Sequence, residues 1–348
     1  MKNRNLILNI LGIAALFGVL RLFEAYGSEY QVRILDNMGV FITLAVSYNL
    51  VVGVCGQLHL GPNAFITIGA YTSALLTMSP AEKQMSFIIT PLVWPLNVLH
   101  APFALSLVAG GVMAALFAFL ISFPVFRVRG DYLAIVTLGF GEVVRVLANA
   151  LQSVTNGPLG LKGLPPRTNL WWSWGIAVLT TLLVVKLINS SYGRAMKAIR
   201  EDETAAKAMG IDPFRHLVLA FMVSAFFSGV SGGLLAHLIT TISPTLFTFF
   251  LTFNLLMIIV VGGLGSTTGA IVGAVLFTWG SEALRVVESD MNFGLFTIPG
   301  IPGMRMVLFS LILLLVIIFA RHGVMGRGEI TWNRIASGWG ALAGRKSA

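Results

Sequence analysis

The stretch GRAMKAIREDETAAKAMGIDPFRH, Gly193 to His216, is the most charged part of an otherwise apolar chain. It holds nine of the chain's thirty-seven charged residues, and apolar runs flank it on both sides. Its Ala and Met content and its lack of β-branched runs predict helix. Gly210 is expected to end that helix, and Asp212-Pro213 to cap and begin the next. The stretch therefore predicts a small water-exposed helical segment, residues 190–216, between two membrane spans.

The composition around this stretch excludes an ordinary soluble domain. Of 348 residues, 56% are hydrophobic and only 11% are charged, and the mean hydropathy is +0.86. Soluble domains carry about 25% charged residues. We expect an all-α integral membrane protein with about ten transmembrane helices, over residues 6–20, 38–54, 64–76, 103–125, 132–151, 174–188, 217–239, 246–261, 270–287 and 306–320.

The distribution of positive charge predicts the orientation. With 190–216 in the cytoplasm, the inside segments hold fourteen Lys and Arg residues and the outside loops hold four. Cytoplasmic loops of membrane proteins collect such residues. We therefore expect a transmembrane domain over 1–320, a basic cytoplasmic tail over 321–348, and both termini in the cytoplasm. The net charge of +9 has the same explanation, so no nucleic-acid partner is expected.

Two Gly-rich breaks interrupt the apolar pattern, at 53–61 and 262–273. Irregular backbone near membrane depth is tolerated where it is buried in protein or lines a wet cavity. One interpretation is a substrate path or gate; the alternative is close helix packing by small residues. A weak internal echo, VVGVCG at 51–56 and VVGGLG at 260–265, is consistent with two related halves. The path candidates in the breaks are Gly53, Gly56, Gln57, His59, Gly61, Gly262, Gly263 and Gly265.

Three further features carry charge or irregular backbone. Glu142 and Arg145 lie three apart near the middle of a predicted span, where ionisable residues are costly. They could line a path or pair structurally. Glu282 and Arg285 have the same spacing near an outer helix end, which favours a solvated pair. The Asn156–Gly163 loop could dock an external partner, cover a pore or be a plain turn.

The search for catalytic motifs finds none. No GxxxxGK[ST], HExxH or GxSxG pattern occurs, and one cysteine excludes a cysteine-rich metal site. We expect no enzyme activity, no metal site and no cofactor bound by this chain.

Five stretches resemble, in order, the signatures of bacterial branched-chain amino-acid ABC transporter permeases of the Liv type. They are GQLHLGPNAFITIGAY (56–71), GDYLAIVTLGFGEVVR (130–145), TNGPLGLKG (155–163), GRAMKAIREDETAAKAMGI (193–211) and VVGGLGSTTGAIVGA (260–274). The order His59…Pro62-Asn63 departs from the family pattern, which bears on substrate preference if this loop lines the path.

The resemblance implies a translocation subunit of the bacterial inner membrane that works with a second permease, two ATPases that bind ATP and Mg, and a periplasmic binding protein. Membrane lipid would surround it. It also implies that 190–216 is a coupling segment docked on an ATPase, with contact candidates Arg194, Arg200, Glu201, Asp202, Glu203, Ala205, Ala206 and Gly210. Branched-chain amino acids are the expected substrates, with urea or short amides as the alternative. An ion-coupled secondary transporter centred on Glu142 and Arg145 is a hypothesis of a different class.

Overall fold

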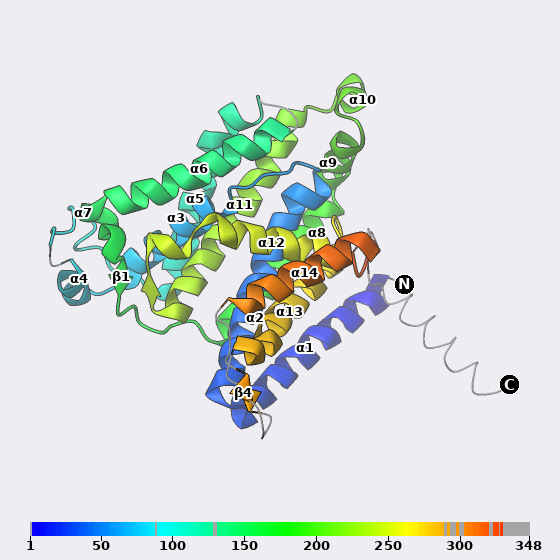
Figure 1. Ribbon diagram of the computed structural model, residues 1–348. Helices are drawn as coiled ribbons and strands as arrows, with labels where there is room; N and C mark the ends of the chain where they lie inside the picture. The colour runs from blue at the N-terminus through cyan, green and yellow to red at the C-terminus, as the bar shows by residue number, and fades with distance from the viewer. Residues whose placement is uncertain are drawn as a thin grey trace.

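The structure is a computed structural model, and it describes residues 2–87, 89–127, 131–288, 291–292, 297–298, 303–319, 323–326 and 328–329. The chain is helical almost throughout these residues (Figure 1). The α-helices are α1 (Lys2–Tyr26), α2 (Glu29–Asn49), α3 (Pro62–Thr77), α4 (Pro80–Ser86), α5 (Phe103–Val125), α6 (Asp131–Ala150), α7 (Gln152–Thr155), α8 (Leu170–Ile188), α9 (Ser191–Glu201), α10 (Glu203–Ala208), α11 (Pro213–Ile239), α12 (Phe249–Gly262), α13 (Thr267–Ala283) and α14 (Met304–Phe319).

Short elements join these helices. One π-helical segment, η1 (Leu50–Val54), extends α2, and the 3-10 segments are η2 (Gly157–Leu159), η3 (Pro244–Leu246) and η4 (Leu284–Glu288). The strands form two antiparallel pairs. Strand β1 (Leu161–Lys162) pairs with β2 (Thr241–Ile242), with Leu161 opposite Ile242. Strand β3 (Met291–Asn292) pairs with β4 (Thr297–Ile298), with Met291 opposite Ile298.

Seven helical segments in the described residues are long and apolar enough to cross a membrane. They cover 8–26, 29–54, 103–125, 132–150, 170–188, 213–239 and 244–262. The remaining three predicted spans fall on α3, α13 and α14, which have only 16, 17 and 16 residues. Helical structure therefore lies over each of the ten predicted segments. Seven segments are long enough for a span, and the segment 244–262 reaches that length because it joins η3 to α12.

Helices α2 and α11 form the centre of the bundle. The apolar windows of these two helices are 83% and 78% buried, whereas that of α1 is 6% buried. Glycines let the backbones of α3, α5 and α11 touch: a Cβ at Gly69 would lie 2.1 Å from the Gly229 carbonyl oxygen, and one at Gly229 would lie 2.7 Å from the Gly110 carbonyl oxygen. Because small residues allow such close approach, apolar helices can pack without large interlocking side chains.

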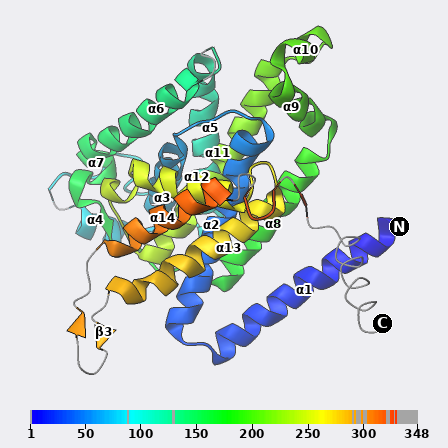
Figure 2. The same cartoon turned by 45° about the vertical axis from the view of Figure 1, so that its right-hand side comes forward.

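The bundle has two distinct ends. Helices α9 and α10 project at one end, and α4, α7 and β1 gather at the other (Figures 1 and 2). We call these the α10 end and the α4 end. The turn from α2 to α3 contains the first Gly-rich break, and the second runs from the α12–α13 turn into α13. Both turns lie at the α10 end, where Arg200 and Asn49 contact them.

Candidate functional site

The charged stretch folds as two short helices rather than one. Ser190 caps α9, whose buried stripe is Gly193, Met196 and Ile199. At Asp202 the backbone turns extended, and the Asp202 carboxylate accepts hydrogen bonds from the Thr204 and Ala205 N–H groups at 2.7 and 2.9 Å. The side chain thus satisfies the start of α10 and interrupts the predicted continuous coupling helix.

The end of this segment follows the sequence prediction. Helix α10 ends at Ala208, and Gly210 has φ of +81°, a conformation that favours glycine. The Asp212 carboxylate then accepts from the Phe214 N–H, and Pro213 occupies the first turn of α11. Gly210, Asp212 and Pro213 therefore have the roles expected of them.

Most predicted contact residues of this segment lie on its surface. Arg194, Glu201, Asp202, Ala205 and Gly210 are exposed. Glu203 is half-buried and pairs with Lys207 at 2.7 Å, while Ala206 is buried and accepts from the Ile211 N–H. Figure 2 shows α10 standing clear of the helix bundle. An exposed, well-capped helix end of this kind offers a rigid surface for another molecule.

Arg200 points the other way, into the bundle. Its Nη1 donates to the Gly53 carbonyl oxygen at 2.5 Å, across 147 positions of sequence. Glycine on both sides makes room for it: a Cβ at Gly56 would lie 2.7 Å from the Arg200 Cγ, and one at Gly265 would lie 2.9 Å from its Nη1. Gly56 and Gly265 also have φ of +71° and +85°. Arg200 therefore joins the charged segment to both Gly-rich breaks.

The two breaks also bond to each other through Asn49. The Asn49 side chain accepts from the Gly265 N–H at 2.9 Å and donates to the Ser266 carbonyl oxygen at 3.1 Å. A Cβ at Gly53 would lie 2.4 Å from the Gly265 nitrogen. We call this arrangement the junction and define it as Asn49, Gly53, Arg200, Gly265 and Ser266. Its backbones are so close that glycine is required at 53, whatever else the breaks do.

The second break is also held by Glu329, which follows α14 in the chain. The Glu329 carboxylate accepts from the N–H groups of Thr267 and Thr268, at 2.6 and 3.1 Å, at the start of α13. Upstream, the Val324 N–H donates to the Val261 carbonyl oxygen at 2.8 Å. A carboxylate at a helix N-terminus is favoured by both hydrogen bonding and the helix dipole. The described part of the predicted tail is thus docked; residues 330–348 lie outside the described residues.

The remaining path candidates of the breaks have varied surroundings. Gly56 is exposed and Gln57 is half-buried. His59 is 1% exposed; its ring meets Tyr48 and Phe221 edge-on, and neither ring nitrogen has a hydrogen-bond partner among the described residues.

Close packing explains the buried glycines of the breaks. A Cβ at Gly61 would meet the Thr137 carbonyl oxygen at 2.5 Å, and one at Gly262 would meet the Gly269 carbonyl oxygen at 2.0 Å. A Cβ at Gly263, where φ is +124°, would lie 2.5 Å from the Gly326 carbonyl oxygen.

Glu142 and Arg145 pair with each other on α6, with 2.7 Å between the Arg145 Nε and the Glu142 carboxylate. Both side chains are about one-third exposed, at 34% for Glu142 and 29% for Arg145. Within the described residues, neither side chain hydrogen-bonds to a junction residue. The structural pairing that the spacing allowed is therefore present, and the exposed part of the pair is available to whatever covers α6.

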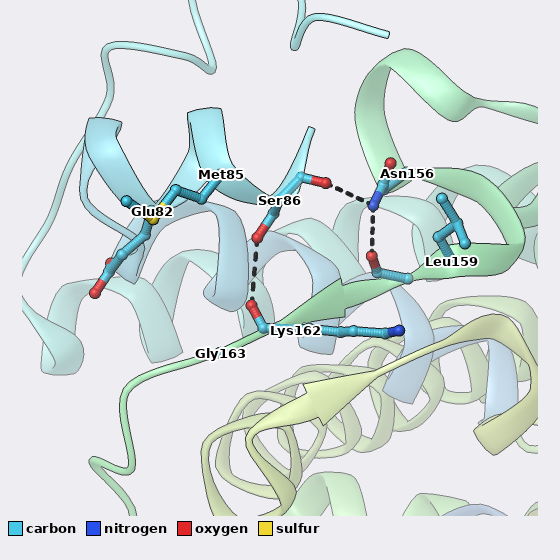
Figure 3. A pocket seen from close by; sticks show the side chains of 8 residues that line it. Glu82, Met85, Ser86, Asn156, Leu159, Lys162 and Gly163 are labelled. Carbon is cyan, nitrogen blue, oxygen red and sulfur yellow. Dashed lines mark hydrogen bonds between the residues drawn. The ribbon is translucent and has the colours of Figure 1, made fainter. Parts of the chain in front are cut away.

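At the α4 end, the Asn156–Gly163 loop packs against α4 around a pocket of about 390 Å³ (Figure 3). The Asn156 amide donates to the Ser86 and Gly160 carbonyl oxygens at 2.9 and 2.8 Å, and the Ser86 hydroxyl donates to the Lys162 carbonyl oxygen at 3.3 Å. These bonds and the β1–β2 pair join three separate segments into one surface: α4, the Asn156–Gly163 loop and β2.

Lys83 fixes the neighbouring loop. The side chain is 2% exposed, and its Nζ donates to the Leu96 carbonyl oxygen at 2.7 Å and to the Leu99 carbonyl oxygen. No carboxylate pairs with it among the described residues. Burial lowers the pKa of the Lys83 ammonium below its ordinary value of 10.5.

Sequence reasoning missed two side chains that hold the breaks, Asn49 and Glu329. Asn49 lies inside an apolar run, where an amide needs partners, and that was a usable signal. Glu329 carried no such signal, because its partners are sixty-one and sixty-two positions earlier in the chain. Within the described residues, no group of three His, Cys, Asp or Glu side chains gathers as a metal site would require.

Comparisons with known proteins agree with the resemblance in the sequence. Residues 30–320 match the family described as branched-chain amino acid transport system / permease component. The chain is 35% identical over 280 residues to the high-affinity branched-chain amino acid transport system permease protein LivM of Escherichia coli, covering 71% of this chain and 61% of that one. It is 34% identical to the LivM protein of Salmonella typhimurium, covering 74% and 64%.

A second type of relative is more distant but more completely covered. The chain is 24% identical to the high-affinity branched-chain amino acid transport system permease protein LivH of Escherichia coli, over 83% of this chain and 92% of that one. The chain thus spans slightly less than two thirds of the LivM proteins and nearly all of LivH. No solved structure gives a significant match.

Proposed function

Because the chain belongs to the family of branched-chain amino acid transport system permease components, we propose that it is the permease subunit of an ATP-driven importer. It carries branched-chain amino acids across the bacterial inner membrane, and it is a translocation subunit rather than an enzyme. The relatives' names supply the substrate class. Urea or short amides are the alternative cargo for the same machinery.

The observation that carries the proposal is the connection from α10 to the Gly-rich breaks. Helix α10 is exposed, and Arg200, two residues before the Asp202 cap, donates to Gly53 inside the bundle. A displacement of α10 is therefore transmitted through the Arg200 guanidinium and the Asn49 hydrogen bonds. It reaches the C-terminal end of α2 and the N-terminal end of α13. Such rigid displacement of packed helices is a common way to switch access across a membrane.

The proposed partners follow from this arrangement. Two ATPase subunits dock at the α10 end and hold ATP and Mg, whose hydrolysis supplies the energy. A second permease completes the membrane domain; the likeness of this chain to both LivM and LivH is what two related permeases of one transporter would show. A periplasmic binding protein meets the tied surface at the α4 end, and lipid surrounds the exposed helices.

The proposed topology has ten spans with both termini in the cytoplasm. Taken in chain order, α1, α2, α3, α5, α6, α8, α11, α12, α13 and α14 alternate in direction between the α10 end and the α4 end. The positive charge of α9 and α10 then lies inside, as expected. Helices α3, α13 and α14 are too short to cross the membrane alone and serve as partial spans. The turns of the Gly-rich breaks complete the crossing of α3 and α13.

The proposed path runs past the junction, with Gly53 to Gly61 and Gly262 to Gly265 as its cytoplasmic gate. Glu142 and Arg145 lie on the half-exposed face of α6, where the second permease would cover them. An ion-coupled secondary transporter would use the same pair as its coupling site, but it gives no role to the exposed α10.

The test is the retention of ATPase subunits when the assembled complex is purified in mild detergent. Ala205→Glu places a charge on the exposed face of α10, and Ala81→Glu makes the same change on the exposed face of α4, at the other end. We expect Ala205→Glu to lose the ATPase and Ala81→Glu to retain it. A complex that keeps a stoichiometric ATPase with Ala205→Glu would refute docking at α10, and a wild-type chain that purifies with no ATPase would favour the secondary transporter.

A further inference from the structure

A separate pocket of about 330 Å³ opens at the α4 end, between the start of α2 and the ends of α11 and α13. Its size lies at the lower end of the roughly 300–1,000 Å³ typical of small-molecule sites. The residues that give it chemical character are Arg33, Asn37, Phe41, Phe277, Glu282 and Arg285. None of them takes part in the junction.

Two charged groups of this pocket are paired, and a third lines it. Arg285 Nη1 lies 3.3 Å from the Glu282 carboxylate and donates to the Tyr30 hydroxyl at 3.3 Å. Arg33 donates once, at 3.4 Å, to the Leu238 carbonyl oxygen. Since a guanidinium has five N–H donors, both arginines keep donors for a ligand. The pocket carries two positive charges and one negative charge.

An apolar wall faces these charges. The rings of Phe41 and Phe277 lie against each other with centroids 5.6 Å apart, and Ile34, Leu238 and Ile239 complete the lining. The pocket therefore joins an acid–base pair to an aliphatic and aromatic surface within one small volume.

We propose that this pocket binds an aliphatic amino acid as a zwitterion. The α-carboxylate lies on Arg285 and Arg33, the α-ammonium on Glu282, and the side chain on Phe41 and Phe277. The two charges of an amino-acid head group are adjacent, so they need an acid and a base that are also adjacent, and the 3.3 Å Glu282–Arg285 pair supplies them. Arginine suits this role because it grips carboxylates bidentately.

The pocket beside α4 offers a contrast. It too has an acid and a base, but Figure 3 shows Glu82 and Lys162 directed to opposite sides of it. One oxygen of Glu82 already accepts from the Ser79 N–H at 2.7 Å. Those charges point away from each other (Figure 3), so of these two pockets the α2–α11–α13 pocket fits an amino-acid head group better.

The choice of a branched-chain amino acid as the ligand rests on the proposed function, whereas the fit to a zwitterion rests on the pocket alone. Because the pocket lies at the α4 end, where the binding protein is proposed to dock, it would hold the amino acid before the path opens.

The experiment measures L-leucine binding to the full chain in lipid nanodiscs by calorimetry. We expect Arg285→Gln and Glu282→Gln each to weaken binding by at least about tenfold, as loss of a charged hydrogen bond does. The matched control is Arg21→Gln, which breaks an exposed pair of the same i,i+3 spacing on α1 and should leave binding unchanged. Equal binding by wild type and Arg285→Gln, or no binding by wild type at millimolar leucine, would overturn the proposal.

A ligand series on wild type keeps the test decisive if a variant does not fold. 4-Methylpentanoate is leucine without the ammonium and isoamylamine is leucine without the carboxylate, and each should bind at least about tenfold more weakly than leucine. If either binds equally well, the zwitterion assignment is wrong. Leucine uptake by the assembled transporter separates the two proposals. If uptake is unchanged in Arg285→Gln and Glu282→Gln, only the pocket proposal is refuted. If the wild-type transporter takes up no leucine, the proposed transport function is refuted.

Discussion

The two ends of the bundle hold their turns together in different ways. At the α10 end, the breaks meet backbone to backbone, with Gly53 against Gly265, and the long-range side-chain bonds come from Asn49, Arg200, Ser266 and Glu329. At the α4 end, Asn156, Ser86 and Lys83 each bond to backbone of a distant segment, and β1 pairs with β2. At the first end, glycine contacts between two turns are added to the side-chain bonds; at the second, side-chain bonds and a strand pair hold loops to a short helix.

We propose that the glycine contacts between the two breaks are the part that shifts and that the α4 end is the part that stays fixed. Close glycine contacts have no interlocking side chains to unpack, so helices can slide past one another with little rearrangement. Many side chain–backbone bonds over short segments resist such movement. The proposed switch therefore lies at the α10 end, and the α4 end keeps its shape for the molecules that it meets. Three variants test this contrast, taken in order of the expected loss of stability.

Gly53→Val should have the largest effect. Its Cβ would lie 2.1 Å from the Asn49 Oδ1 and 2.4 Å from the Gly265 nitrogen. Such overpacking against backbone should cost about 3 kcal/mol of unfolding free energy, seen as a lower thermal midpoint in detergent. Gly139→Val on α6 is the matched control, because nothing lies within 4 Å of its Cβ. If Gly53→Val unfolds at the wild-type temperature, the α10 end is not held by backbone contact.

Lys83→Met should cost about 2 kcal/mol near neutral pH, because two buried carbonyl oxygens lose their charged donor. The pH dependence gives a second readout. Because the pKa of Lys83 is lowered in the folded chain, the unfolded chain binds this proton more tightly. Wild-type stability should therefore rise with pH between the lowered pKa and 10.5.

Lys83→Met should lose that rise with pH, and Lys207→Met, at an exposed position on α10, should keep it. The measurement is the thermal midpoint of each variant between pH 8 and pH 10.5. Parallel curves for wild type and Lys83→Met would show that the α4 end does not depend on this ammonium.

Arg200→Gln should cost only about 1 kcal/mol, because the lost bond is half-exposed. Its main effect should be on coupling: the ATPase stays bound, but its stimulation by loaded binding protein falls about tenfold. Ala205→Glu should give the opposite pattern, with loss of the ATPase itself. If Arg200→Gln also releases the ATPase, Arg200 acts as a docking residue and the bond to Gly53 is incidental.

The features that sequence reasoning found are those encoded locally. Gly210 and Asp212-Pro213 mark helix ends through their own backbone preferences, and apolar runs mark helices through their length. The interruption at Asp202 is also local, since its side chain competes for the N–H groups of α10, but the helix-forming residues around it obscured that signal.

The features that sequence reasoning could not find depend on distant contacts. Arg200 reads as one more charge in a charged segment, and only the fold turns it toward Gly53, 147 positions away. In the same way, Arg33 and Arg285 belong to helices far apart in the chain, and their pocket exists only once α2 and α13 are packed together.

The bonds from Glu329 to the start of α13 have a consequence for how the protein is made. The donors of these bonds, Thr267 and Thr268, leave the ribosome about sixty residues before the acceptor does. The Thr267 and Thr268 N–H groups therefore lack their Glu329 acceptor until α14 has been synthesised and inserted and Glu329 has folded back onto the start of α13. During synthesis, the last hydrogen bonds at the start of α13 to form are supplied by a residue that follows the final described helix.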